Sequence, residues 1–197
     1  MFRHVVAGLM LASLIACGVP MSHPSMAPVR LQPVRVANTP LQGAYMCIEL
    51  RPTAAMQAKA RELRMSLGFL DMTRAIPPRA PEAFHVTVAY FKTLSPGSAQ
   101  KLAERYQHAA VPLKITGWGV AQQQAAYFTV QGLQDWKPTI QTIVPDTCVG
   151  DDPHVTFGVH PGKPKDVHGV PKPLQNHLVP MDVIGDVHLK QGDRIVW

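Results

Sequence analysis

The chain has 197 residues, of which 46% are hydrophobic and 16% are charged, so it holds enough apolar side chains for one compact domain and a tail. This composition excludes a disordered chain and a coiled coil, and three cysteines exclude a small disulfide scaffold. Nineteen Lys and Arg residues against 13 acidic ones give a net charge of +6, which suits an anionic partner.

The amino terminus has the pattern of a secretory signal sequence. Arg3 precedes an uncharged apolar run from 5 to 16. A helix of that length spans only about 18 Å, whereas a bilayer core is about 30 Å thick. The run ends in Leu14-Ile15-Ala16-Cys17, which resembles a bacterial lipobox. Residues 1–17 are therefore predicted to be a signal peptide.

Cys17 would carry the lipid that anchors the protein in the cell envelope, facing the periplasm or the exterior. A true start at Met21 would instead leave the protein in the cytoplasm.

Residues 18–40 are predicted to form a linker. Five prolines punctuate this segment, and it has neither helical nor alternating periodicity. Proline at this density keeps a chain extended and unpaired. The folded domain is expected to cover residues 41–197.

Within that domain, strands and helices are predicted without strict βαβ alternation. The expected strands are 45–50, 84–91, 113–120, 125–130, 154–159, and a closing hairpin of 183–189 with 194–197. The expected helices are 54–69, 96 to about 110, and 135–143, with Thr53 and Ser95 as N-caps of the first two. Loops rich in Pro or Gly are expected at 74–81 and 162–176. This order favours an α+β fold with antiparallel sheets.

Two copies of one tetrapeptide carry the chemistry. His85-Val86-Thr87-Val88 and His154-Val155-Thr156-Phe157 each open a predicted strand, 69 positions apart. Because residues two apart in a strand point to the same face, each copy presents one imidazole and one hydroxyl there. The next residues on that face are expected to be Ala89 and Gly158, which are small and leave space for a ligand.

Two imidazoles and two hydroxyls around one cleft suit phosphoester cleavage without a metal ion or other cofactor. Imidazole has an ordinary pKa near 6.5, so one histidine can act as base while the other acts as acid near neutral pH. Threonine hydroxyls can donate hydrogen bonds to phosphoryl oxygens. The sequence leaves open which histidine is the base.

These motifs resemble those of the 2H phosphoesterase superfamily, which is named for two His-h-Thr-h motifs with h apolar. The resemblance covers about residues 41–197. It implies a bilobal, pseudo-two-fold α+β fold with antiparallel sheets flanked by helices around a central cleft. It also implies that His85 and His154 are catalytic and that Thr87 and Thr156 bind the substrate phosphate.

The superfamily includes RNA 2′,3′-cyclic phosphodiesterases and cyclic-nucleotide phosphodiesterases. The expected activity is therefore metal-independent hydrolysis of a 2′,3′-cyclic phosphate, or of a related nucleotide or short RNA phosphodiester, by a monomer. A lipid anchor favours small nucleotides or RNA fragments outside the cytoplasm over intracellular RNA.

Two other functions remain open. The first is an envelope lipoprotein that binds a nucleotide or RNA in the same cleft without turnover. The second is a metal-binding lipoprotein, because five histidines fall within residues 154–188. These histidines are His154, His160, His168, His177 and His188.

Several further residues have both a functional and an ordinary interpretation. Three lysines in the second loop would contact phosphate or form a solvated basic loop: Lys163, Lys165 and Lys172. Three aromatic residues would stack on a base or fill the core: Tyr90, Trp118 and Tyr127. Cys47 and Cys148 would pair only if the fold brings them together.

Overall fold

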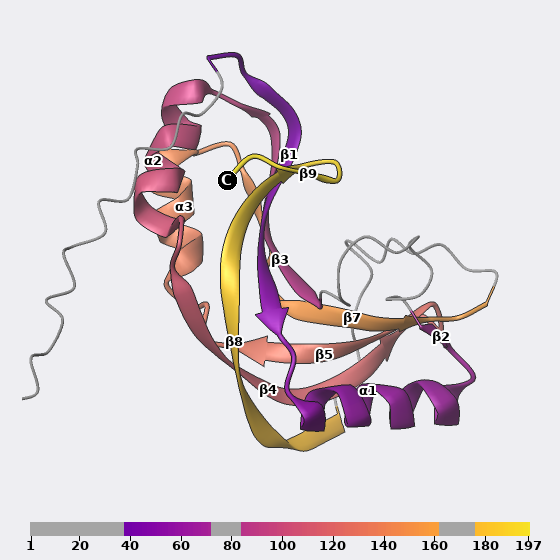
Figure 1. Ribbon diagram of the computed structural model, residues 1–197. Coiled ribbons are helices and arrows are strands. Elements are labelled where there is room, and N and C mark those ends of the chain that lie inside the picture. Colours follow the sequence, from indigo (N-terminus) through magenta and orange to yellow (C-terminus); the bar gives the residue numbers. More distant parts are fainter. Residues whose placement is uncertain (1–37, 72–83, 162–175) are drawn as a thin grey trace, which may run out of the picture. The chain divides into compact units, whose positions relative to one another are not determined.

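The computed structural model describes residues 38–71, 84–161 and 176–197. Several sequence predictions lie outside the described residues: the signal peptide with Cys17, nearly all of the linker, the whole of the loop 74–81, nearly all of the loop 162–176, and Lys163, Lys165, His168 and Lys172. The described part is α+β, as the sequence predicted, with three helices and one antiparallel sheet of nine strands (Figure 1).

The strands pair into a closed circuit. They are β1 (Leu41–Arg51), β2 (Leu70–Asp71), β3 (His85–Leu94), β4 (Ala110–Ala121), β5 (Ala125–Gln131), β6 (Cys148–Val149), β7 (His154–Val159), β8 (Asn176–Gln191) and β9 (Arg194–Ile195). Their order is β2-β7-β5-β4-β8-β1-β3-β6, with β9 paired to β8. Val86 of β3 also pairs with Val155 of β7, which closes the ring β7-β5-β4-β8-β1-β3. The two motif strands are therefore direct neighbours.

The pairings on either side of this contact repeat one pattern. β3 pairs with β1, and β7 pairs with β5. β1 pairs in turn with β8, and β5 pairs with β4. β8 and β4 pair with each other. The short strand β2, which follows β1, lies on β7, whereas β6, which follows β5, lies on β3. The two motif strands thus occupy equivalent places in the sheet.

Helix α1 (Ala54–Leu67) begins and ends where its capping residues dictate. The Thr53 side chain accepts a hydrogen bond from the Met56 amide at 3.2 Å, which confirms the predicted N-cap. Gly68 ends the helix in the left-handed conformation with φ 64°, so α1 stops two residues before the predicted end. The helix packs against β7 and buries Met56, Ala60 and Leu63.

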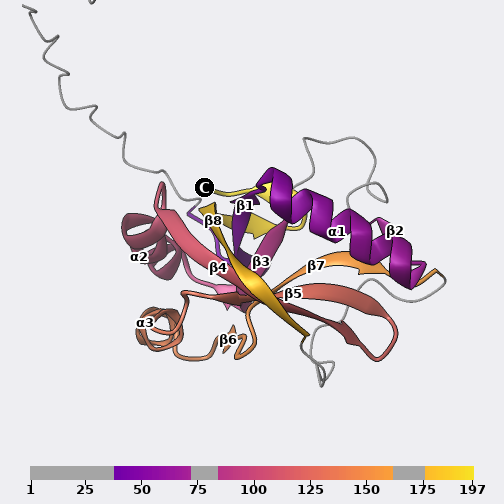
Figure 2. The same cartoon turned by 90° about the horizontal axis from the view of Figure 1, so that it is seen from below.

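Helices α2 (Pro96–Tyr106) and α3 (Trp136–Ile143) lie side by side, away from α1 (Figure 2). Ser95 caps α2 as predicted, but the helix ends at Tyr106 rather than near 110 because the chain leaves the helix to enter β4 at Ala110. The Tyr106 ring stacks on Trp136 with 4.5 Å between ring centroids, which fixes the start of α3. In the described segments, no helix has the length and apolarity needed to span a bilayer.

One face of the sheet forms the core with the helices. Along both motif strands the apolar positions are buried in one hydrophobic cluster that also contains residues of all three helices. The histidine and threonine of each motif alternate with these buried positions, which are Val86, Val88, Val155 and Phe157. The opposite face carries the histidines and threonines of both motifs.

Strand β8 differs most from the sequence prediction, which placed a loop up to 176 and a strand only at 183–189. The strand runs from Asn176 to Gln191 because its first half pairs with β4 and its second half with β1. Pro180 falls between His177 and Met181, where the register with β4 shifts, so its missing amide breaks no regular ladder position. Tertiary pairing thus overrides the weak local signal.

Gly185 is a point of close approach between β8 and β1. A Cβ at this position would lie 2.3 Å from Ile48 Cγ2 and 2.9 Å from the Glu49 carbonyl oxygen. Gly185→Ala is therefore expected to reduce the free energy of unfolding by about 1–3 kcal/mol. Urea titration measures this loss. Gly97→Ala is the control, because nothing lies within 4 Å of its added Cβ. Equal stabilities of the two variants would contradict the close approach.

Candidate functional site

The register of β3 and β7 brings both motifs to one place. Since Val86 pairs with Val155 in an antiparallel ladder, one step each way puts His85 opposite Thr156 and Thr87 opposite His154. Opposite side chains on one face have Cβ atoms about 4.5–5.5 Å apart. The four residues therefore form a compact square in which each threonine neighbours the histidine of the other motif.

The two histidines have different surroundings. His154 is half-buried, and its Nδ1 lies 2.8 Å from the carbonyl oxygen of Asp152. Because a carbonyl only accepts, Nδ1 carries the proton and Nε2 carries the lone pair of the neutral ring. The Tyr127 ring packs edge-on to His154 at 5.8 Å between centroids. His85, in contrast, is exposed.

The expectation that Ala89 and Gly158 follow on the same face is wrong. The register shifts after each threonine, because Cys47 pairs with Thr87 while Met46 pairs with Ala89. β7 shifts in the same way against β5, between Thr156 and Gly158. Each motif strand thus has a β-bulge at the fourth residue of its motif, which reverses the alternation and buries Ala89 and Gly158.

Both bulges are held by a specific hydrogen bond to the extra residue. The carbonyl oxygen of Val88 accepts from the Gly150 amide at 3.2 Å. The carbonyl oxygen of Phe157 accepts from Arg64 Nη1 of α1 at 3.1 Å. Satisfying these carbonyls stabilises the bulges, and each bulge ends the face on which its His and Thr lie. The repeat therefore extends from sequence to backbone geometry.

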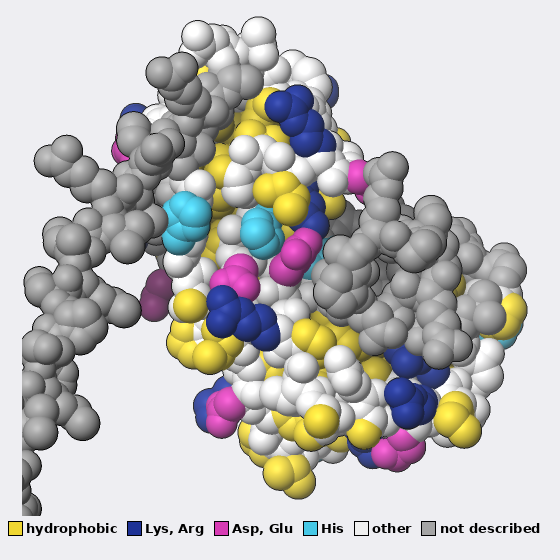
Figure 3. All heavy atoms as spheres, in the orientation of Figure 1, with side chains coloured by type: hydrophobic (Ala, Val, Ile, Leu, Met, Phe, Trp, Pro, Cys, Tyr) yellow, Lys and Arg dark blue, Asp and Glu magenta, His cyan; other side chains and the backbone are white. Residues whose placement is uncertain are grey.

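The motif square continues across β5, β1 and β8 as two rows of side chains. One row consists of Tyr127, Thr156, His85, Glu49 and Asp186, and the other of Thr129, His154, Thr87, Cys47 and His188. In Figure 3, which has the orientation of Figure 1, histidine, acidic and basic side chains lie together over the middle of β1 and β8. Charged side chains are thus concentrated on β1 and β8, next to the strand that carries His85.

Glu49 is the central residue of this charged group and is not among the site residues predicted from the sequence. Its carboxylate forms an ion pair with Lys190 and lies 3.7 Å from His188 Nε2. Its position is directly opposite His85 in the β1–β3 ladder. A signal was present in the sequence, because Glu49 is the one charge within the apolar run Tyr45 to Leu50. A carboxylate beside an imidazole stabilises the protonated ring.

Neighbouring groups follow the same electrostatic logic. Burial is the largest influence on Lys190 and lowers its pKa, but the hydrogen bond to Glu49 and the attraction to Cys47, Glu49 and Tyr45 together outweigh burial and raise the lysine pKa. Burial raises the pKa of the Cys47 thiol to about 12, so this side chain stays a neutral thiol. The hydrogen bond from Arg51 lowers the pKa of Asp186, which the arginine contacts at 2.7 Å.

The equivalent positions beside His154 carry no charge. Thr129 lies opposite His154, where Glu49 lies opposite His85. Beyond Thr129, β4 contributes Gly117, where β8 contributes Asp186. Two similar motifs therefore differ at the position directly opposite the histidine, which is Glu49 for His85 and Thr129 for His154.

The remaining candidates from the sequence are scattered or engaged elsewhere. Cys47 is buried, Cys148 is exposed, and both are free thiols. Tyr127 is fully buried and offers no exposed stacking face, while Trp118 is half-buried and Tyr90 is 45% exposed. Among residues 38–71, 84–161 and 176–197, no three His, Cys, Asp or Glu side chains gather as metal ligands would.

No protein-family model matches this chain, and no curated protein matches its sequence.

Proposed function

We propose that this chain is a metal-independent phosphodiesterase of the 2H phosphoesterase type. The pairing of Val86 with Val155 carries the proposal, because it assembles two imidazoles and two hydroxyls on one face of the sheet. The repeated pairings and the matched bulges support the finer proposal of a pseudo-two-fold, bilobal 2H fold. The proposed substrate is a 2′,3′-cyclic phosphate or a related nucleotide or short RNA phosphodiester.

Two observations support the proposed roles of the histidines, namely the contact of His154 with the Asp152 carbonyl and the position of Glu49 opposite His85. His154, with its lone pair on Nε2, takes the proton of the attacking water. As the new P–O bond forms, the bond to one ribose oxygen breaks, and protonated His85 gives its proton to that oxygen. The ring opens to a phosphomonoester, and solvent restores both protonation states. The Thr87 and Thr156 hydroxyls donate to the nonbridging oxygens, where charge develops.

The proposal also places the protein outside the cytoplasm. Cys17 would carry the lipid, and the proline-rich segment after it would tether the domain to the membrane. Substrates would then be nucleotides or RNA fragments in the envelope, and the enzyme would act as a monomer.

Turnover in EDTA tests the proposed function. The purified full chain is incubated with 2′,3′-cyclic nucleotides, 2′–5′ and 3′–5′ dinucleotides and cyclic dinucleotides, and ³¹P NMR identifies the product. Conversion of a diester to a monoester in EDTA is expected. Saturable binding without product would favour the binding lipoprotein instead. Activity that EDTA abolishes and added metal restores would overturn metal independence.

Glu49 is expected to set the alkaline limb of the pH–rate profile. Glu49 occupies the ladder position opposite His85. A carboxylate there would favour the protonated imidazole of the proposed acid, which is lost as pH rises through that limb. Glu49→Gln is therefore expected to move this limb to lower pH by roughly 0.5–1 unit. The expected shift is modest because the Glu49 carboxylate also forms an ion pair with Lys190 and lies close to His188. The acidic limb should stay in place.

The matched control is Glu62→Gln on α1, since this glutamate forms a surface ion pair with Lys59. The measurement is kcat/KM from pH 5 to 9 for the three proteins. An unchanged alkaline limb in Glu49→Gln would show that Glu49 does not act on the proposed acid.

A further inference from the structure

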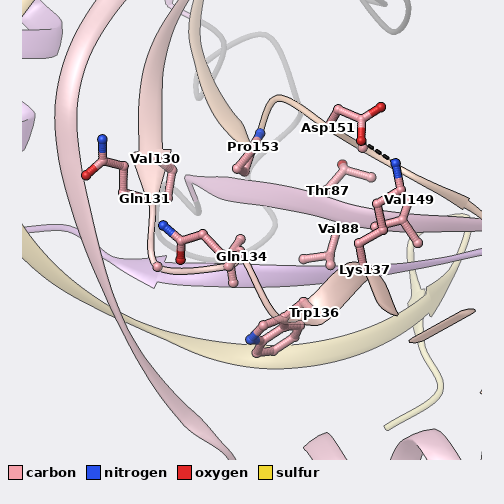
Figure 4. Close-up of a pocket in the computed structure, with 13 residues that line it drawn as sticks. Thr87, Val88, Val130, Gln131, Gln134, Trp136, Lys137, Val149, Asp151 and Pro153 are labelled. Carbon is pink, nitrogen blue, oxygen red and sulfur yellow. Dashed lines mark hydrogen bonds and ion pairs between the residues drawn. The ribbon is translucent and has the colours of Figure 1, made fainter. Parts of the chain in front are cut away.

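A pocket of about 290 Å³ opens beside the motif square. Three segments form it: β3, the segment from the end of β5 into α3, and the segment that leads to β7 (Figure 4). Thr87 and Val88 of the first motif line it, and Pro153, next to His154 in the chain, lines it as well. The pocket therefore adjoins the Thr87–His154 side of the square.

The lining combines apolar walls with polar groups. Val88, Val130 and Leu133 are buried residues that supply aliphatic surface, and Trp136 supplies an aromatic ring. That ring is held in place because Tyr106 stacks on it. Figure 4 shows Gln131 at the end of β5 and Gln134 in the segment that follows. Their carboxamides offer both hydrogen-bond donors and acceptors.

The one cation that lines the pocket in the described part of the chain is already paired. Lys137 forms an ion pair with Asp151 across the rim (Figure 4). A second phosphate would therefore have to displace Asp151. A flat, uncharged group with polar edges fits this lining better than an anion does.

We propose that this pocket binds the nucleobase of the substrate whose phosphate lies on the motif square. This inference rests on the proposed function and specifies it: the substrate is a nucleotide, read by one base. Aliphatic and aromatic walls sandwich the base, and amide groups bind its edges, as in other single-strand readers. A volume of about 290 Å³ lies at the low end for small-molecule sites, which favours one base over a dinucleotide.

Binding of product analogues tests the pocket without requiring turnover. The full chain is titrated calorimetrically with the four nucleoside 2′-monophosphates and with methyl riboside 2′-monophosphate, which lacks the base. At least one nucleotide is expected to bind 10-fold or more tightly than the base-free analogue. Trp fluorescence should be quenched by that nucleotide, and the quenching should be lost in Trp136→Phe.

Val149→Phe fills the pocket, and Val120→Phe is its matched control. Both valines are half-buried and pack on the core, but only Val149 lines the pocket. Val149→Phe is expected to bring the nucleotide down to the affinity of the base-free analogue, which itself stays unchanged. Val120→Phe should keep the preference for the base.

The outcomes separate this inference from the proposed function. Equal affinity for nucleotide and base-free analogue, or full base preference in Val149→Phe, overturns the pocket even where the chain hydrolyses diesters. A base preference lost only in Val149→Phe supports the pocket, even where no diester is turned over and the proposed hydrolysis fails.

Discussion

His154→Ala and His85→Ala are each expected to lower kcat by about 10²–10⁴-fold, because each removes one proton-transfer partner. The two variants should differ in how their kcat depends on pH. His154 is the proposed base, held as the Nδ1–H tautomer by the Asp152 carbonyl, so its removal should abolish the acidic limb of the profile. His85 is the proposed acid opposite Glu49, so its removal should abolish the alkaline limb.

The measurement is kcat between pH 5 and 9 on the best diester of the panel, in EDTA. His177→Ala is the control, since this exposed histidine of β8 pairs with Gly117, away from the motif square. It should keep wild-type kcat. A substrate with a very good leaving group needs little acid help, so it should rescue His85→Ala and not His154→Ala. Loss of the same limb in both variants would contradict the assigned roles.

The main features of the site were predictable from strand periodicity. His85 and Thr87 alternate with two valines, which is the pattern expected of a strand with one buried face. The second copy repeats this pattern from His154. Thr53 and Ser95 likewise marked the starts of their helices. These signals are local, so a single sequence carries them.

Other features depend on pairing between distant segments. Nothing local marks the bulges after Thr87 and Thr156, which bury Ala89 and Gly158 where simple alternation exposes them. The role of Glu49 likewise appears only when β1 is placed beside β3. Register between strands is a tertiary property, so charges that meet across a sheet cannot be paired from one strand alone.

Thr87→Val and Thr156→Val are expected to lower kcat by about 10²–10³-fold each, because each removes a hydroxyl that we propose donates to charge developing in the transition state. Valine keeps the β-branched shape of threonine, so strand pairing and the thermal midpoint should change little. Thr87→Ser and Thr156→Ser retain the hydroxyl and should stay within 10-fold of wild type. This rescue distinguishes donation from packing.

The control is Thr93→Val, because Thr93 lies on the same strand as Thr87 but its hydroxyl donates to Gln42 at the surface. It should keep full activity. Thr87 neighbours His154, and Thr156 neighbours His85, so the two proposed donors would reach the phosphate from opposite corners of the square. If they bind different oxygens, their losses should multiply in the double variant. Losses that do not multiply would mean that both hydroxyls serve one oxygen, and full activity in either valine variant would remove that threonine from the phosphate site.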